Sequence, residues 1–292
     1  MTDIPRCLWP LHAELGEGPV WLQQQQALYF VDVKGQQIHR CCADGQQRSS
    51  WAVPQQLGFI VPTHDGDFIC GLQDGLHYFS TETGRFSMMH AIEPELPGNR
   101  LNDGHVDALG RLWFGSMDNA ETAPTGSLYC VDNAEKLLLQ DSNYVITNGP
   151  ALSPDGRTLY HNDTVKKIIY AFDVAANSSL NNKRIFTQIT ATGHPDGMAV
   201  DTDGYLWVAM FGGWRIDRYS PSGELVATIP FPCANITKLS FGGEDMHTVF
   251  VTTAWKGLTP QEREQQPQAG SLFCFRSDST GLPQYSFGPV HA

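Results

Sequence analysis

The segment Asp107-Ala108-Leu109-Gly110-Arg111-Leu112-Trp113-Phe114 joins a turn to a short apolar strand with an aromatic at its centre. The same pattern occurs at five other places, namely Leu28-Tyr29-Phe30, Asp67-Phe68-Ile69, Leu159-Tyr160-His161, Leu206-Trp207-Val208 and Val249-Phe250-Val251. The central aromatics are roughly 39 to 47 residues apart, a period typical of propeller blades with four strands each. The sequence therefore predicts an all-β fold, a six-bladed β-propeller whose loops surround one central channel.

The remaining strands follow from the same repeat. A second hairpin arm comes after each aromatic strand, for example Gly126-Ser127-Leu128-Tyr129, and we expect it to form the third strand of its blade. We predict that Arg6-Cys7-Leu8-Trp9 pairs with the C-terminal blade and closes the ring, because closure removes exposed strand edges. The stretch Thr259 to Gln268 is charged and Gln-rich, which predicts a surface helix or a long loop. Since no Pro/Ser/Gly linker interrupts the repeat, residues 1–292 are expected to form a single domain.

Composition and charge argue against several classes of protein. The net charge of −12 at pH 7 disfavours binding to nucleic acid or to an anionic membrane. The seven cysteines include the adjacent pair Cys41 and Cys42 and no C-x-x-C spacing, which suits a reduced chain better than a disulfide scaffold. No apolar run is long enough for a signal peptide or a bilayer span. We therefore expect a soluble, cytoplasmic monomer or weak homo-oligomer.

Two segments near inner strands carry polar groups that a strand repeat alone does not need. In the segment 15–21, Glu17 lies between two glycines just before an apolar strand, although an exposed turn is an equally simple interpretation. In the segment 99–107, Asn102-Asp103-Gly104 is an ordinary turn tripeptide. Arg100 and Asn102, however, are two residues apart, and such residues point to the same face of an extended segment. One guanidinium and one carboxamide are thus expected to face one ligand.

Two further segments lie later in the chain. Asn148 precedes Gly149-Pro150 and has no duty in a turn, so its carbonyl oxygen is free to bind a ligand. Asp196-Gly197 has two interpretations, a turn or a site, whereas Asp201 is predicted to be structural.

Glu17, Asn148 and Asp196 lie at a similar offset before the aromatic strands of their blades, so the propeller is expected to bring them to the same end of the channel. Two carboxylates and one amide oxygen make a hard oxygen site for one divalent cation. With three protein ligands, coordination positions remain for water and substrate, as catalysis requires. An ion that only holds the blades together is the alternative.

The ordered set of motifs resembles the senescence marker protein (regucalcin)/gluconolactonase family, and the resemblance covers nearly the whole chain. It is carried by Leu15-Gly16-Glu17-Gly18-Pro19, Asn99-Arg100-Leu101-Asn102-Asp103-Gly104, Gly110 to Met117, Thr147-Asn148-Gly149-Pro150, His194-Pro195-Asp196-Gly197 and Phe241-Gly242-Gly243. Within the family, the segments 146–163 and 235–243 look most like bacterial sugar lactonases such as xylonolactonase.

The resemblance implies a six-bladed propeller with a central metal site and a role for each matched residue. The implied metal ligands are Glu17, Asn148 and Asp196, with Asp196 also the catalytic residue that handles a proton. The implied substrate-binding residues are Arg100, Asn102 and Glu121, with Asp118 competing for the last position. The implied activity is hydrolysis of an aldono-1,4- or 1,5-lactone, a small-molecule sugar lactone, to the aldonate. Oxygen ligands accept Ca, Zn, Mn, Mg or Fe(II), so the identity of the cation stays open.

Two other functions remain open at this point. One is a non-catalytic calcium-binding regulatory propeller, and the other is a related hydrolase of organophosphates or aryl esters. Arg100 and Asn102 count against both, because they suit a polyhydroxylated ligand. His105 and His194 flank the site segments and are predicted to be structural, and Arg215 is predicted to pair with Asp217.

Overall fold

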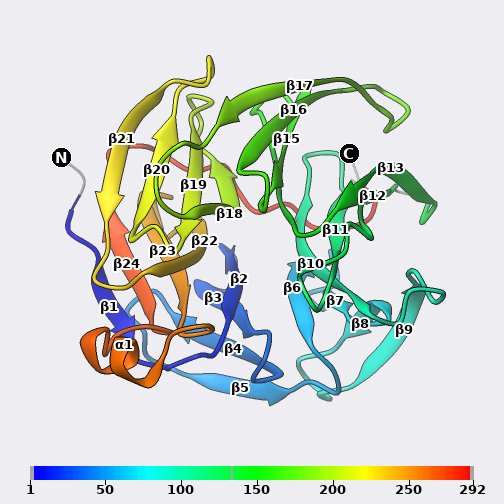
Figure 1. Cartoon of the computed structure of the whole chain (residues 1–292). Helices are drawn as coiled ribbons and strands as arrows, with labels where there is room; N and C mark the ends of the chain where they lie inside the picture. The colour runs from blue at the N-terminus through cyan, green and yellow to red at the C-terminus, as the bar shows by residue number, and fades with distance from the viewer. Residues whose placement is uncertain (1–2, 133, 290–292) are drawn as a thin grey trace.

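Six four-stranded antiparallel sheets are arranged as blades around a central channel, which confirms the predicted six-bladed propeller (Figure 1). The computed structural model describes residues 3–132 and 134–289. The innermost strands are β2 (Gly16–Leu22), β6 (Leu57–Pro62), β10 (Asn99–Val106), β14 (Thr147–Leu152), β18 (His194–Val200) and β22 (Asn235–Gly242). The second strands are β3 (Ala27–Asp32), β7 (Phe68–Leu72), β11 (Leu112–Asp118), β15 (Thr158–Asp163), β19 (Leu206–Phe211) and β23 (Thr248–Ala254). We number the blades 1 to 6 in the order of these innermost strands.

The outer half of each blade also follows the predicted order. The third strands are β4 (Gln37–Cys42), β8 (Gly75–Phe79), β12 (Gly126–Val131), β16 (Ile168–Val174), β20 (Arg215–Tyr219) and β24 (Leu272–Arg276). The outer strands are β5 (Ser49–Ala52), β9 (Phe86–Ala91), β13 (Leu137–Tyr144), β17 (Leu180–Gln188), β21 (Leu225–Pro230) and, in blade 6, β1 (Arg6–Trp9). Strand β1 pairs antiparallel with β24, with Arg6 opposite Cys274 and Cys7 opposite Phe273, so the predicted closure of the ring is confirmed.

The core lies between the blades rather than inside any one of them. Buried apolar side chains form six clusters, and each cluster joins the facing sheets of two neighbouring blades. The alternation along a strand explains this arrangement, since Phe114 packs toward Phe59 of blade 2 while its neighbour Trp113 packs toward Leu152 of blade 4. The aromatic-centred strands are therefore apolar on both faces because both faces are buried.

Two buried aspartates connect the repeat's turn to its aromatic strand. The Asp107 carboxylate accepts a hydrogen bond from the Trp113 indole at 2.8 Å, and Asp201 accepts one from the Trp207 indole at 3.0 Å. Each aspartate also accepts hydrogen bonds from backbone N–H groups of its own turn. Asp201 is thus structural, as predicted.

Every innermost strand contains a β-bulge at the same level of the channel. The register with the second strand shifts between Glu17 and Val20, Leu57 and Phe59, Leu101 and Gly104, Asn148 and Ala151, Pro195 and Met198, and Ile236 and Lys238. A bulge bends the strand and changes the direction of its side chains, and bulges are common beside active sites. Asn102-Asp103-Gly104 and Asp196-Gly197 therefore lie in bulged strands, so their interpretation as hairpin turns is wrong.

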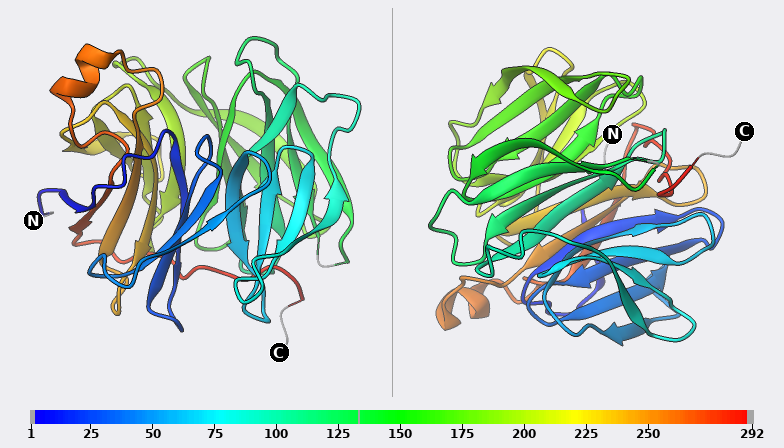
Figure 2. Two further views of the ribbon diagram at one scale, coloured as in Figure 1. Left: turned by 90° about the horizontal axis from the view of Figure 1, so that it is seen from below. Right: turned by 90° about the vertical axis from the view of Figure 1, so that its right-hand side faces the viewer.

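The two ends of the channel differ. The segment after β24 runs across one end, where Thr280, Gly281, Phe287 and Gly288 form backbone hydrogen bonds with blades 5, 6, 2 and 3 respectively. Figure 2 shows this segment at the end opposite α1 (Pro260–Gln265), the short helix found within the predicted charged stretch. No helix in the described part of the chain is long and apolar enough to cross a membrane.

Candidate functional site

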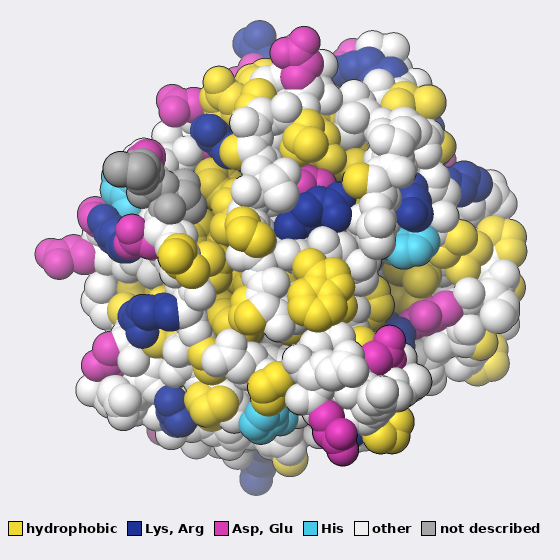
Figure 3. All heavy atoms as spheres, turned by 60° about the vertical axis from the view of Figure 1, so that its left-hand side comes forward, with side chains coloured by type: hydrophobic (Ala, Val, Ile, Leu, Met, Phe, Trp, Pro, Cys, Tyr) yellow, Lys and Arg dark blue, Asp and Glu magenta, His cyan; other side chains and the backbone are white. Residues whose placement is uncertain are grey.

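A cavity of about 310 Å³ lies in the channel, and the innermost strands provide most of its polar groups. It is lined by Leu15, Glu17, Arg100, Asn102, Met117, Glu121, Ile146, Thr164, His194, Asp196, Phe211 and Lys256. On the outer face shown in Figure 3, acidic and basic side chains are interspersed instead of being grouped by sign. A cluster of acidic side chains lies inside the channel instead.

Glu17 and Asp196 are the two buried carboxylates that line the cavity, and they are only 7% and 6% exposed. The Gly18 N–H donates to Glu17 at 3.0 Å, whereas no described residue donates a hydrogen bond to the Asp196 carboxylate. Burial raises the pKa of Glu17 to about 8, with repulsion from Asp103 adding to the shift. Burial and repulsion from Glu17 raise the pKa of Asp196 well above its ordinary value. Positive charge from Lys238 opposes both shifts but does not cancel them.

Asn148, predicted to meet these carboxylates, is 4% exposed and is not among the described residues that line the cavity. Its Oδ1 accepts a hydrogen bond from Asn102 Nδ2 at 2.8 Å, and its Nδ2 donates to Thr164 Oγ1 at 2.9 Å. Asn148 is therefore held against two residues of the cavity wall, with its amide oxygen toward Asn102.

Arg100 and Asn102 both line the cavity, as their spacing on an extended strand suggests. The guanidinium of Arg100 donates to Asn102 Oδ1 at 2.7 Å, to the Leu101 carbonyl at 3.0 Å and to Asn119 Oδ1 at 3.2 Å. These acceptors are all uncharged. Burial lowers the pKa of Arg100 to about 10, so its positive charge is present at neutral pH and is available to a ligand.

Glu121 lies in the loop after β11 and lines the cavity, where its carboxylate forms an ion pair with Lys256. Lys256 follows β23 of blade 6, so this pair joins opposite blades across the channel. The competing Asp118 has another role, because its carboxylate accepts hydrogen bonds from the N–H groups of Ala120, Thr122 and Ala123. These bonds lower the pKa of Asp118 to about 2 and hold the loop that presents Glu121.

The structure also contains two residues beneath the cavity that the sequence analysis did not assign to the site. Asp103, expected in a turn, is 2% exposed and forms a buried ion pair with Lys238 of β22. Its other oxygen accepts a hydrogen bond from the Gly149 N–H at 3.1 Å. The available signal was a lysine inside the apolar strand Ile236-Thr237-Lys238-Leu239, since a buried lysine needs a partner.

The two histidines occupy different places. His194 lines the cavity, and its Nδ1 lies 3.1 Å from the Thr164 carbonyl oxygen. His105 instead lines a smaller cavity deeper in the channel, where burial lowers its pKa to about 4 and keeps the imidazole neutral at pH 7. Arg215 pairs with Asp217, as predicted.

The donor set around Glu17 and Asp196 fits a hard cation. Two buried carboxylates that repel each other are the kind of ligands that Ca²⁺ and similar ions prefer, and an amide oxygen such as that of Asn148 is a ligand of the same kind. The described residues contain no group of three His, Cys, Asp or Glu side chains arranged to hold a metal. A cation at this place therefore depends on an amide oxygen and on water in addition to the carboxylates.

Comparisons with known proteins show the family to which the chain belongs. The family model described as SMP-30/Gluconolactonase/LRE-like region matches residues 15–255. The chain is 35% identical to an L-arabinolactonase of Azospirillum brasilense (94% of this chain, 92% of the relative) and 29% identical to a 6-deoxy-6-sulfogluconolactonase of Pseudomonas putida (98% and 99%). Its structure is similar to that of a calcium-binding regucalcin from Agrobacterium tumefaciens, with a TM-score of 0.91, 28% identity and coverage of 97% and 96%. The chain therefore belongs to the SMP-30/gluconolactonase/LRE-like family.

Proposed function

We propose that this protein is a metal-dependent lactonase that opens an aldono-1,4- or 1,5-lactone to the aldonate. The main support is the meeting of Glu17 and Asp196 with Arg100 and Asn102 in one cavity. The lactonase names of similar proteins support the same reaction, and the calcium-binding regucalcin supports a divalent cation.

In this proposal, Glu17, Asn148 and Asp196 hold the cation, which would polarise the ester carbonyl and lower the pKa of a bound water. Arg100 and Asn102 orient the sugar by donating hydrogen bonds to its oxygens, and Glu121 accepts from a hydroxyl once its contact with Lys256 is exchanged. Because no described residue donates a hydrogen bond to its carboxylate, Asp196 can take the proton of the attacking water and pass it to the ring oxygen as the acyl C–O bond breaks, which yields the open hydroxy acid that ionises to the aldonate. Apolar side chains such as Phe211 and Met117 limit the access of bulk water to the cavity.

The test is a pH-indicator assay on a panel of pentono- and hexonolactones with the chelated protein, reloaded in turn with Ca²⁺, Mg²⁺, Mn²⁺, Zn²⁺ and Fe²⁺. We expect metal-dependent hydrolysis above the spontaneous rate, and its loss in Asp196→Asn. Asp203→Asn, which changes a carboxylate away from the cavity, is the matched control and keeps the wild-type rate.

Two outcomes would contradict the proposal. Wild-type turnover by folded Asp196→Asn would exclude the assigned role of this residue. Calcium binding without turnover of any lactone would favour the non-catalytic regulatory propeller, and turnover restricted to aryl esters or organophosphates would favour the other hydrolase class.

A further inference from the structure

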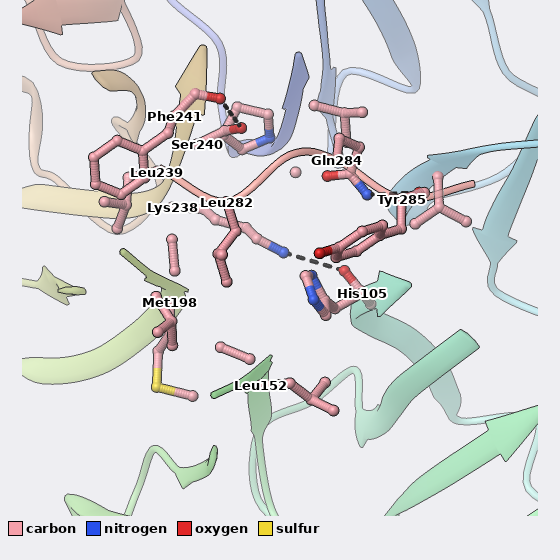
Figure 4. A pocket seen from close by; sticks show the side chains of 18 of the residues that line it. His105, Leu152, Met198, Lys238, Leu239, Ser240, Phe241, Leu282, Gln284 and Tyr285 are labelled. Atoms are coloured by element: carbon pink, nitrogen blue, oxygen red, sulfur yellow. Dashed lines mark hydrogen bonds between the residues drawn. The ribbon is translucent and has the colours of Figure 1, made fainter. Parts of the chain in front are cut away.

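Lys238 is a buried cation for which the proposed reaction has no direct use. It projects from β22 into the channel, where it lines the smaller, deeper cavity of about 70 Å³ (Figure 4). Its side chain is 9% exposed, and its stem packs so closely on Gly197 that an added Cβ there would lie 2.4 Å from Lys238 Cγ. The stem therefore runs directly beside Asp196.

The ammonium of Lys238 is fixed on the opposite side of the channel. It pairs with the Asp103 carboxylate and lies 3.3 Å from the Gly104 carbonyl oxygen. Asp103 is in turn held by the N–H groups of Gly104 and Gly149, at 2.7 and 3.1 Å. The ion pair is thus built into the backbone next to Asn148 on one side and Asp196 on the other.

The charges around this pair are unbalanced. Glu17, Asp103 and Asp196 are three buried carboxylates, and burial raises the pKa of each of them. The Lys238 ammonium opposes that shift in all three groups. Arg100 and Lys256 also add positive charge, but Lys256 pairs with Glu121, and Arg100 is bound to uncharged oxygens. Lys238 is the cation that is ion-paired within the acidic cluster itself.

We propose that Lys238 is an internal counter-ion of the candidate cation site, which limits how strongly the carboxylates attract a metal ion and sets the ionic charge that the site prefers. The inference rests on the proposed function, because it presumes that Glu17 and Asp196 hold a cation. A fixed positive charge beneath the site repels every metal ion and repels a trivalent ion more than a divalent one, since the interaction scales with the product of the charges. Lys238 therefore favours a divalent over a trivalent cation.

The test compares cation affinities of the chelated protein, with no reading of activity. Calorimetry gives the affinity for Ca²⁺ and luminescence gives that for Tb³⁺, at one pH and one ionic strength. In Lys238→Met, which keeps the apolar stem, we expect Ca²⁺ to bind about tenfold more tightly and Tb³⁺ about 30-fold more tightly, so that the preference for Tb³⁺ over Ca²⁺ rises by about threefold. Lys136→Met, at an exposed position, is the matched control and leaves both affinities unchanged.

Asp103 supplies the reverse test. Asp103→Asn removes one negative charge and leaves Lys238 unpaired, so Ca²⁺ is expected to bind about tenfold more weakly. The double variant Lys238→Met/Asp103→Asn removes one charge of each sign and is expected to return to within about threefold of the wild type. The double variant leaves no unpaired buried charge. If Lys238→Met alone does not fold, the Ca²⁺ affinities of the double variant and of Asp103→Asn test the role of Lys238 instead.

The outcomes separate the two proposals. If the wild type binds Ca²⁺ and both single variants bind it with unchanged affinity, the role of Lys238 is overturned and the proposed function stands. If the wild type binds none of the divalent cations tested, the proposed function fails and this inference fails with it.

Discussion

Arg100→Met should lower kcat/KM for a sugar lactone far more than it lowers the stability of the fold. The guanidinium is 3% exposed, donates only to the uncharged oxygens of Leu101, Asn102 and Asn119, and faces the cavity. A hydrogen bond from a charged donor contributes about 1.5–3 kcal/mol. Since 1.36 kcal/mol corresponds to about tenfold in rate, loss of one such bond to the sugar lowers kcat/KM by about 10- to 150-fold.

The assay measures initial rates over a range of lactone concentrations, so that kcat and KM are separated. If Arg100 binds the ground state and the transition state equally, KM rises and kcat stays constant. Arg215→Met is the control, because Arg215 pairs with Asp217 outside the cavity and should leave kcat/KM unchanged. A kcat/KM in folded Arg100→Met within about twofold of the wild type would refute the assignment of Arg100 to the substrate.

Two further predictions concern stability. His161 is fully buried against Tyr144, neither ring nitrogen has a hydrogen-bond partner among the described residues, and burial lowers its pKa from 6.5 to about 3. Between these two pKa values the unfolded chain binds more protons than the folded chain, so the stability contributed by neutral His161 is complete above about pH 6.5 and is lost as the pH falls. His161→Phe should therefore reduce the difference between the urea midpoints measured at about pH 7.5 and about pH 4.5. An unchanged difference would contradict this prediction. Asp107→Ala leaves the Arg111 charge and the Trp113 indole buried without this partner and should lower the free energy of unfolding in urea by about 3–5 kcal/mol. Asp65→Ala, at an exposed turn, is the control and should lower it by less than about 1 kcal/mol. Equal losses in the two variants would exclude the link between turn and strand.

The sequence predicts the parts of this structure that depend on local pattern. The aromatic strands, the third strand of each blade and the closing strand β1 are all set by alternation and spacing, and all are present. Glu17 and Asp196, which their offset in the repeat places at one end of the channel, line one cavity, whereas Asn148, expected with them, is not among its lining residues. Arg100 and Asn102, predicted from their spacing, and Glu121, implied by the resemblance, line the same cavity.

The interactions that were missed connect residues far apart in the chain. Lys238 meets Asp103, and Lys256 meets Glu121, across 135 positions in each case. Locally, Asn102-Asp103-Gly104 has the composition of a turn, and nothing within a few residues shows that β22 brings a lysine against it. The bulges had no local signal either, because they arise from the pairing of two strands and not from the residues of one.

The position of the apolar core between the blades affects which amino-acid substitutions the propeller can tolerate. Apolar packing lies between the blades, whereas polar side chains of the innermost strands, such as Arg100 and Asp196, line the cavity in the channel. Replacing such a polar residue changes the groups that face a ligand and removes no apolar contact between blades. Single substitutions in the channel can therefore change specificity while the propeller scaffold is kept.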